Sequence, residues 1–187
     1  MSAKLVALLR GINVGRAKRV SMAELRAVVA ELGYTNVRTL LNSGNVVFGA
    51  PVRAKAATSR AAAAAAARIE EAVAARIGLS SRVTVLTAAE LDAAIAANPL
   101  LDVADDPSRL LVAVLSDPKD RPKLEPLLKQ EWDPEVLALG PRVAYVWVPD
   151  GVRDARVLKA VEKALAGGVT SRNWSTMLKL QAMTRAD

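Results

Sequence analysis

Residues 37–48, VRTLLNSGNVVF, contain two short strand-like runs on either side of the tetrapeptide NSGN. The runs Val37–Leu41 and Val46–Phe48 are rich in β-branched and large apolar residues, which favour extended backbone. Asparagine, serine and glycine are residues that tight turns commonly use. The stretch therefore predicts a β-hairpin, and the elements that flank this hairpin decide the fold.

Moving outward from the hairpin in either direction along the chain, the sequence predicts first a helix and then a strand. On the N-terminal side, Lys4–Leu9 is strand-like, and residues 21–32 predict a helix that opens with the capping box SMAE and ends before Gly33. On the C-terminal side, the Ala-rich residues 58–77 predict a helix, and Arg82–Leu86 predicts a strand. The order β-α-β-β-α-β is that of the ferredoxin-like α/β plait, whose sheet has the strand order 4-1-3-2.

The same order of elements returns in the second half of the chain. Residues 87–98 first predict an additional helix, which opens with a second capping box, TAAE, and ends before Pro99. Residues 98–108 are typical of a linker. The elements predicted after the linker are a strand at Arg109–Leu115, a helix within residues 116–130, strands at Glu135–Leu139 and Val143–Val148, a helix at Val152–Leu165, a short strand at Val169–Ser171 and a helix at Asn173–Met183.

We therefore predict the α+β class, with two ferredoxin-like subdomains. The first spans residues 1–86 and carries a basic loop, and the second spans residues 109–187 and carries a terminal helix. Residues 87–108 form the connecting helix and linker. The segments KLVALLR, RLLVAVL and VAYVWV are apolar on both alternating sides, so we expect both faces of the sheets to be covered.

The 187 residues include neither cysteine nor histidine. This excludes disulfide bonds, cysteine-ligated zinc and catalysis or metal binding by thiolate or imidazole. We expect no conventional transition-metal site, and no motif indicates a cofactor. The chain does not open with a cleavable signal pattern, and the longest alanine run, Ala61–Ala67, is too short to cross a bilayer. We therefore expect a soluble, cytoplasmic protein.

The positive charge lies in the first third of the sequence. Residues 1–69 contain eleven Lys or Arg and two acids, a net charge of +9, whereas residues 70–187 contain fifteen and seventeen, a net charge of −2. Such asymmetry favours an anionic partner, which could be a phosphate, a nucleic acid or an acidic protein. The alternative is ordinary solvated surface charge.

The basic segment RGINVGRAKR, residues 10–19, follows the first predicted strand and precedes the helix start at Ser21. In the plait, the end of the first strand and the NSGN turn lie at the same edge of the sheet. Glycines at positions 11 and 15 would let backbone amides face a ligand there. The side chains that can converge at this edge are Arg10, Asn13, Lys18, Asn42, Ser43 and Asn45.

We interpret this edge as an anion site, in which Arg10 and Lys18 supply charge and Asn13, Ser43 and Asn45 supply hydrogen bonds. The segment matches neither the GxGxxG nor the GxxxxGK[ST] nucleotide fingerprint. The alternative is structural: the glycines Gly11, Gly15 and Gly44 would serve turn geometry, and the asparagines would hydrogen-bond their own turns.

Several motifs resemble a bacterial family known as domain of unknown function 1697. They are LLRGINVG, MAELR, LGY, NVRTLLNSGNVVF and TSRNWSTMLKL, in this order along nearly the whole chain. The resemblance implies a two-part α/β fold and no established activity. It places the SGN turn of the family at Ser43, Gly44 and Asn45, and adds Arg172, Asn173, Trp174 and Lys179 near the end of the chain. The chain departs from the usual GINVGGKNKI loop, because arginines occupy positions 16 and 19.

Three functions remain open on these observations. The first is the binding of a small anionic or phosphate-containing ligand, with or without catalysis; without histidine, an acid or base would come from Lys18, Lys179, Ser43 or a carboxylate. The second is nucleic-acid binding, which is less favoured because Phe48 is the only aromatic residue on the strands that would stack bases. The third is interaction with an acidic protein. The sequence indicates no catalytic residue and no oligomeric state.

Overall fold

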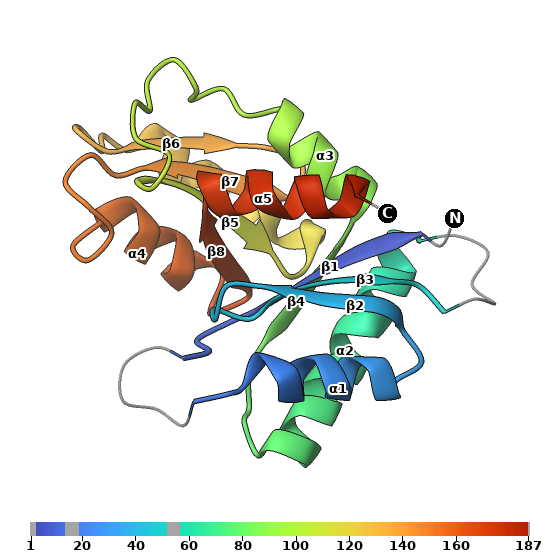
Figure 1. Cartoon of the computed structure of the whole chain (residues 1–187). Helices are drawn as coiled ribbons and strands as arrows, with labels where there is room; N and C mark the ends of the chain where they lie inside the picture. Colours follow the sequence, from blue (N-terminus) through green and yellow to red (C-terminus); the bar gives the residue numbers. More distant parts are fainter. Residues whose placement is uncertain (1–2, 14–18, 52–56, 187) are drawn as a thin grey trace. The chain divides into compact units, whose positions relative to one another are not determined.

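The computed structural model describes residues 3–13, 19–51 and 57–186 (Figure 1). The chain divides into two compact units: the first unit is Met1–Leu91 with Leu180–Asp187, and the second unit is Asp92–Lys179. Each unit contains one four-stranded sheet in which all neighbouring strands are antiparallel. The protein is therefore of the mixed α+β class, as predicted.

The first unit has the element order predicted from its hairpin. Its elements are β1 (Lys4–Leu9), α1 (Met22–Glu31), β2 (Thr35–Leu40), β3 (Asn45–Gly49), α2 (Ser59–Ile77) and β4 (Val83–Thr87). The sheet order is β2-β3-β1-β4, which is the expected 4-1-3-2 order counted from the other edge. In the register, Leu8 of β1 pairs with Asn45 of β3, and Leu9 pairs with Val83 of β4.

Local signals set the ends of both helices of the first unit. At the start of α1, the Ser21 hydroxyl accepts from the Ala23 amide at 3.2 Å, and the Glu24 carboxylate accepts from the Ser21 amide at 3.3 Å, so the predicted capping box is present. The helix α2 begins after Thr58 and ends at Gly78, which has a φ of 70°. Glycine adopts this left-handed conformation without steric cost, which explains the stop.

Both helices of the first unit cover the same face of its sheet (Figure 1). The small side chains Ala62 and Ala65 allow α2 to pack closely, and the rings of Tyr34 and Phe48 meet edge to face at 4.7 Å. The residues of the opposite face are also buried, which agrees with the two-sided apolar pattern of the strands. Examples of these residues are Val6, Leu8, Val47 and Leu86.

The last residues of the chain belong to the first unit. The Arg38 guanidinium of β2 donates to the Met183 carbonyl at 2.6 Å, and the Lys4 ammonium of β1 donates to the Ala186 carbonyl at 2.9 Å. Cations near a helix C-terminus stabilise the exposed carbonyls there. The observed division thus ends the first stretch of this unit at residue 91 and adds residues 180–187, whereas the sequence-based ranges ended it at residue 86.

The second unit repeats the strand order of the first. Its elements are β5 (Leu110–Leu115), the 3-10 helix η1 (Pro118–Lys129), β6 (Val136–Leu139), β7 (Val143–Trp147), α4 (Arg156–Ala164) and β8 (Val169–Asn173), and the boundaries of the unit fall within α3 (Ala88–Ala96) and α5 (Trp174–Arg185). The sheet order is β6-β7-β5-β8. The predicted capping box of α3 is also present, because Thr87 and Glu90 exchange hydrogen bonds of 2.8 and 3.1 Å.

Two predicted helices of the second unit differ from the structure. Within residues 116–130, Pro118–Lys129 form the 3-10 helix η1, because the rings of the interior prolines Pro122 and Pro126 would clash with the carbonyls four residues earlier in an α-helix. The helix predicted at Val152–Leu165 begins at Arg156. Its N-cap, Ala155, has no side-chain acceptor.

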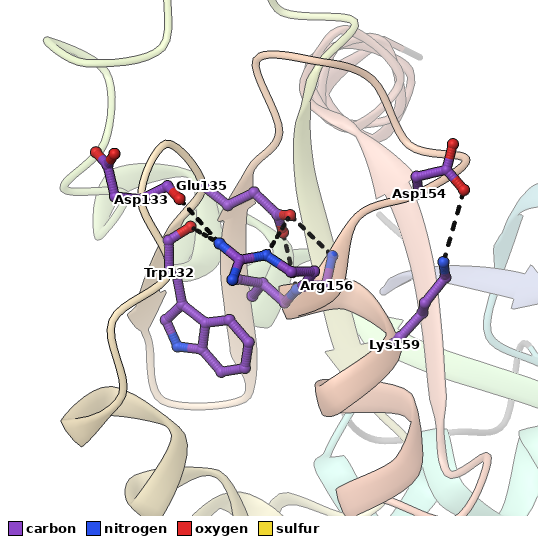
Figure 2. Close-up of polar contacts among 7 residues, drawn as sticks. Trp132, Asp133, Glu135, Asp154, Arg156 and Lys159 are labelled. Atoms are coloured by element: carbon purple, nitrogen blue, oxygen red, sulfur yellow. Dashed lines mark hydrogen bonds and ion pairs between the residues drawn. The ribbon is translucent and has the colours of Figure 1, made fainter.

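A distant carboxylate supplies the missing cap of α4 (Figure 2). Glu135 accepts from the Arg156 and Val157 amides, both at 2.8 Å. The Arg156 guanidinium donates to the Trp132 and Asp133 carbonyls at 2.7 and 2.8 Å and lies 6.0 Å from the centre of the Trp132 ring. This network therefore satisfies a helix start and anchors the segment before β6, which gives it a structural role.

Candidate functional site

The end of β1 and the β2–β3 turn meet at one edge of the first sheet, as the plait order predicted. The Leu9 amide donates to the Gly44 carbonyl at 2.9 Å. The Asn13 side-chain amide donates to the Asn42 carbonyl at 2.7 Å and to the Val20 carbonyl at 3.0 Å. Asn13 thereby joins the segment after β1, the approach to α1 and the turn.

An open cavity of about 720 Å³ lies at this edge, and we call it the edge cavity. It is bounded by three parts of the first unit: the segment after β1, the start of α1 and the β2–β3 turn. Its described lining residues are Ile12, Asn13, Arg19, Val20, Ser21, Met22, Glu24, Leu41, Asn42 and Ser43. Its size falls within the range of about 300–1,000 Å³ typical of small-molecule sites.

The charged groups of the edge cavity are Arg19 and Glu24. Arg19 is exposed and is the one cation among the lining residues that the structure describes. The Glu24 carboxylate is engaged in the capping box, where it accepts from the Ser21 amide. Hydroxyl and amide groups of Ser43 and Asn42 stand on the turn side. A guanidinium beside neutral hydrogen-bonding groups suits an oxyanion.

The remaining wall of the edge cavity is apolar. Ile12 and Val20 are buried, and Met22 is half-buried. Leu41 is 55% exposed and has a φ of 57°. A left-handed conformation is rare for leucine, so this exposed apolar side chain is held at the cavity by the geometry of the turn.

Arg10, the cation predicted for this site, is not among the described residues that line the edge cavity. Its amide donates to the Arg82 carbonyl and its carbonyl accepts from the Ser81 hydroxyl, both at 2.8 Å, so its backbone joins the β4 side of β1. Gly11 is exposed with a φ of 68°. Gly15 and Lys18, also predicted for the site, lie outside the described residues.

The predicted turn residues have a largely structural arrangement. Asn45 is fully buried, and its side-chain amide donates to the Leu40 carbonyl at 3.0 Å and the Ser43 hydroxyl at 2.9 Å. Gly44 has a φ of 76°, and a Cβ atom there would lie 2.9 Å from the Leu9 Cβ. Asn45 and Gly44 therefore shape the turn, as the structural alternative expected. Asn42 and Ser43 are the predicted turn residues that line the edge cavity.

The predicted residues near the C-terminus belong to the second unit. Arg172 lies in β8 opposite Val112, and burial lowers the pKa of its guanidinium to about 10, so it is charged at neutral pH. The Asn173 side chain accepts from the Thr176 amide at 3.0 Å and so caps α5. Trp174 is buried and Lys179 is exposed. Ligand binding by any of these four residues stays a prediction.

Arg19, Met22 and Leu41 line the edge cavity but were not among the predicted site residues. Arg19 is the last residue of the basic segment, and Met22 lies in the predicted capping box SMAE. Leu41 had been assigned to a strand, which in the structure ends one residue earlier, at Leu40. The sequence does not reveal that the strand ends before Leu41, because the adjacent apolar residues Leu40 and Leu41 both favour extended backbone.

Two further findings concern residues 3–13, 19–51 and 57–186, which the structure describes. No group of three or more histidine, cysteine, aspartate or glutamate residues in these ranges could hold a metal ion. None of the helices formed by these residues is long and apolar enough to cross a membrane.

Comparison with solved structures identifies one similar fold and one weak match. The conserved bacterial protein SP0830 from Streptococcus pneumoniae is 24% identical, with a TM-score of 0.77 and full coverage of both chains. This likeness shows a shared fold. Protein BT0572 from Bacteroides thetaiotaomicron is 13% identical, covers 96% of this chain and 97% of its own, and has a TM-score of only 0.22. None of the curated proteins matches. The model of the family described as "Protein of unknown function (DUF1697)" matches residues 2–145, most of the chain, and the protein therefore belongs to this family, as its motifs predicted.

Proposed function

We propose that this protein binds a small anionic or phosphate-containing ligand in the edge cavity. The observation that carries the proposal is the position of Arg19 in an open cavity of about 720 Å³, together with the polar groups of Asn42 and Ser43. A hydrogen bond from a guanidinium to an oxyanion contributes about 1.5–3 kcal/mol, and the net charge of +9 over residues 1–69 favours the approach of anions.

We also propose a fold for each unit and a cellular compartment for the protein. The shared strand orders β2-β3-β1-β4 and β6-β7-β5-β8, with helices in the intervening connections, support a ferredoxin-like plait in each unit. The similar structure of a Streptococcus pneumoniae protein supports a bacterial origin, and we propose the cytoplasm as the compartment. Fractionation of cells that express the protein tests the compartment.

Nucleic-acid binding is the weaker candidate. Single-stranded bases stack on exposed aromatic side chains, but Phe48 is fully buried and Tyr34 is 7% exposed. Binding to nucleic acid would therefore depend on backbone phosphates, and its affinity would fall steeply with salt. An acidic protein partner would engage the same positive charge.

Titration calorimetry with inorganic phosphate tests the proposal. We expect Arg19→Ala to weaken phosphate binding about tenfold to a hundredfold, because it removes one charged hydrogen bond. Arg60→Ala is the matched control: Arg60 is exposed on α2, outside the described lining, and its loss changes the net charge equally. We expect this control to bind as the parent does.

Four results would contradict the proposal. Absence of phosphate binding to the parent would reject it, and equal losses in the Arg19 and Arg60 variants would indicate only general attraction of anions. An effect of Arg10→Ala without an effect of Arg19→Ala would place the site on the β4 side of β1, outside the edge cavity. Salt-sensitive binding of a short oligonucleotide with no effect of phosphate would favour the nucleic-acid candidate.

A further inference from the structure

We infer that the ligand of the edge cavity is an organic anion whose anionic group is attached to an apolar group, and that Leu41 contacts the apolar group. This inference rests on the proposed function, because it assumes that the cavity binds an anion. It adds a chemical class of ligand and a residue that determines specificity.

The volume of the cavity is the first support. At about 720 Å³ it is much larger than an inorganic phosphate or sulfate ion needs. A water molecule in the liquid occupies about 30 Å³, and such an ion is equivalent to only a few waters. Cavities of this size hold drug-sized organic molecules.

The two kinds of wall are the second support. Arg19, Asn42 and Ser43 can bind an anionic group, whereas Ile12 and Met22 offer no hydrogen bond from their side chains. A fully hydrated ion would leave the apolar wall in contact with water. A ligand with one charged and one apolar part would satisfy both walls.

The third support is the conformation of Leu41. Its φ of 57° is costly for leucine and easy for asparagine or glycine, yet its side chain is 55% exposed and gains little burial in return. The exposed leucines described in the second unit, Leu101, Leu128 and Leu178, do not have a positive φ. Single exposed leucines are common, so the distinctive feature of Leu41 is that it combines exposure, a left-handed backbone and a place in the cavity lining.

The test compares three phosphates by titration calorimetry: inorganic phosphate, glycerol 1-phosphate and phenyl phosphate. We expect the parent to bind phenyl phosphate about tenfold more tightly than glycerol 1-phosphate, because covering Leu41 and the apolar wall removes apolar surface from water. Leu41→Asn should weaken the binding of phenyl phosphate severalfold and so reduce, but not abolish, this preference, because Ile12 and Met22 still line the cavity.

Asparagine is chosen because it accepts a left-handed backbone, so the variant should fold, and its melting temperature verifies this. Leu41→Gly, which also accepts this backbone, is a second variant with the same expected binding. Leu178→Asn is the control, because Leu178 is 40% exposed on α5 in the second unit. It should keep the preference for phenyl phosphate.

The possible failures are distinguishable. If inorganic phosphate binds but the parent does not prefer phenyl phosphate, the inference is wrong and the proposed function stands. If the parent prefers phenyl phosphate and both Leu41→Asn and Leu41→Gly keep this preference in full, the contact that we assign to Leu41 is wrong. If the parent binds none of the three phosphates, the proposed function fails and the inference fails with it.

Discussion

In both units, the last residue of the central strand (β1 or β5) donates the same backbone hydrogen bond to the neighbouring hairpin turn. The side chains at this end of the strand differ between the units. In the first unit, the Leu9 amide donates to the Gly44 carbonyl at 2.9 Å, and in the second, the Leu115 amide donates to the Arg142 carbonyl at 3.0 Å. The registers agree, because Leu8 pairs with Asn45 and Val114 pairs with Val143. Gly44 and Arg142 therefore occupy equivalent positions in the two sheets.

The side chains at this position differ strongly, because one residue is Gly44 and the other is Arg142. Arg142 is only 9% exposed, and its guanidinium donates to the Leu115 and Ser116 carbonyls at 3.3 and 3.5 Å, so it folds back over the end of β5. In the first unit, Gly44 has no side chain, and the edge cavity lies beside it. The connection after the central strand is also longer there, residues 10–21 against residues 116–117. The same strand order can thus be combined with an open cavity at this position, as in the first unit, or with a buried arginine side chain, as in the second.

The largest expected effect comes from adding a single carbon at the open edge. Gly44→Ala should lower the free energy of unfolding by about 2–5 kcal/mol, because it combines a left-handed alanine with a Cβ 2.9 Å from the Leu9 Cβ. Gly11→Ala is the control: its φ is 68°, but among the described residues beyond its chain neighbours no atom lies within 4 Å of the added Cβ, so a loss of about 1–2 kcal/mol is expected. Urea denaturation measures both, and equal losses would show that the close approach to Leu9 is unimportant.

The closed edge is tested by removing its cation. Arg142→Ala should lower the free energy of unfolding by about 1.5–3 kcal/mol, because the Leu115 and Ser116 carbonyls lose a charged donor in a largely buried place. Arg153→Ala, at an exposed position of the same unit, should change it by less than about 0.5 kcal/mol. Equal, small effects in urea denaturation would mean that Arg142 does not close this edge.

Asn13 tests whether the open edge is held together from within. Asn13→Gly should lower the free energy of unfolding by about 1–2 kcal/mol, because it removes three hydrogen bonds, two to the Val20 backbone and one to the Asn42 carbonyl, while glycine accepts the φ of 56°. Hydrogen exchange of the Val20 amide, which donates to the Asn13 side chain at 2.7 Å, should become faster. Unchanged exchange with weakened phosphate binding would instead support the predicted contact of Asn13 with the ligand.

The same contrast separates what the sequence could predict from what it could not. Local signals predicted the starts of α1 and α3, because each capping box lies within four consecutive residues. Element order then predicted both sheet orders and the meeting of the end of β1 with the NSGN turn, where Leu9 and Asn13 contact Gly44 and Asn42. The cap of α4 was not predictable in this way, because Glu135 lies 21 residues before Arg156.

Side-chain directions at the site were beyond the sequence for a different reason. Asparagine and glycine in a turn can serve the turn or a ligand, and only packing decides; Asn45 is fully buried and serves the turn. Likewise, one basic segment contains both Arg10 and Arg19, and the charge pattern does not reveal that, of these two, Arg19 is the one described in the cavity lining. Leu41 was assigned to a strand because the pattern does not reveal a change of sign in φ.

The smallest expected effect concerns pH and belongs to the closed turn of the second unit. Burial raises the pKa of Tyr145 to about 12, from an ordinary value of 10. Its hydroxyl donates to the Ala94 carbonyl at 2.6 Å, and a Cβ at Gly140 in the neighbouring turn would lie 2.9 Å from it. The equivalent residue of the first unit is Val47, which cannot titrate.

Between pH 10 and pH 12 the folded protein keeps the Tyr145 proton while the unfolded chain loses it, so stability from this group is complete below pH 10 and falls as the pH rises. The stability advantage of the parent over Tyr145→Phe should therefore shrink by about 1 kcal/mol between pH 9 and pH 11. Urea denaturation of both proteins at each pH measures this difference and cancels groups that titrate alike in both. A constant difference would mean that water reaches the hydroxyl, and that the turn of the second unit is less closed than its buried arginine indicates.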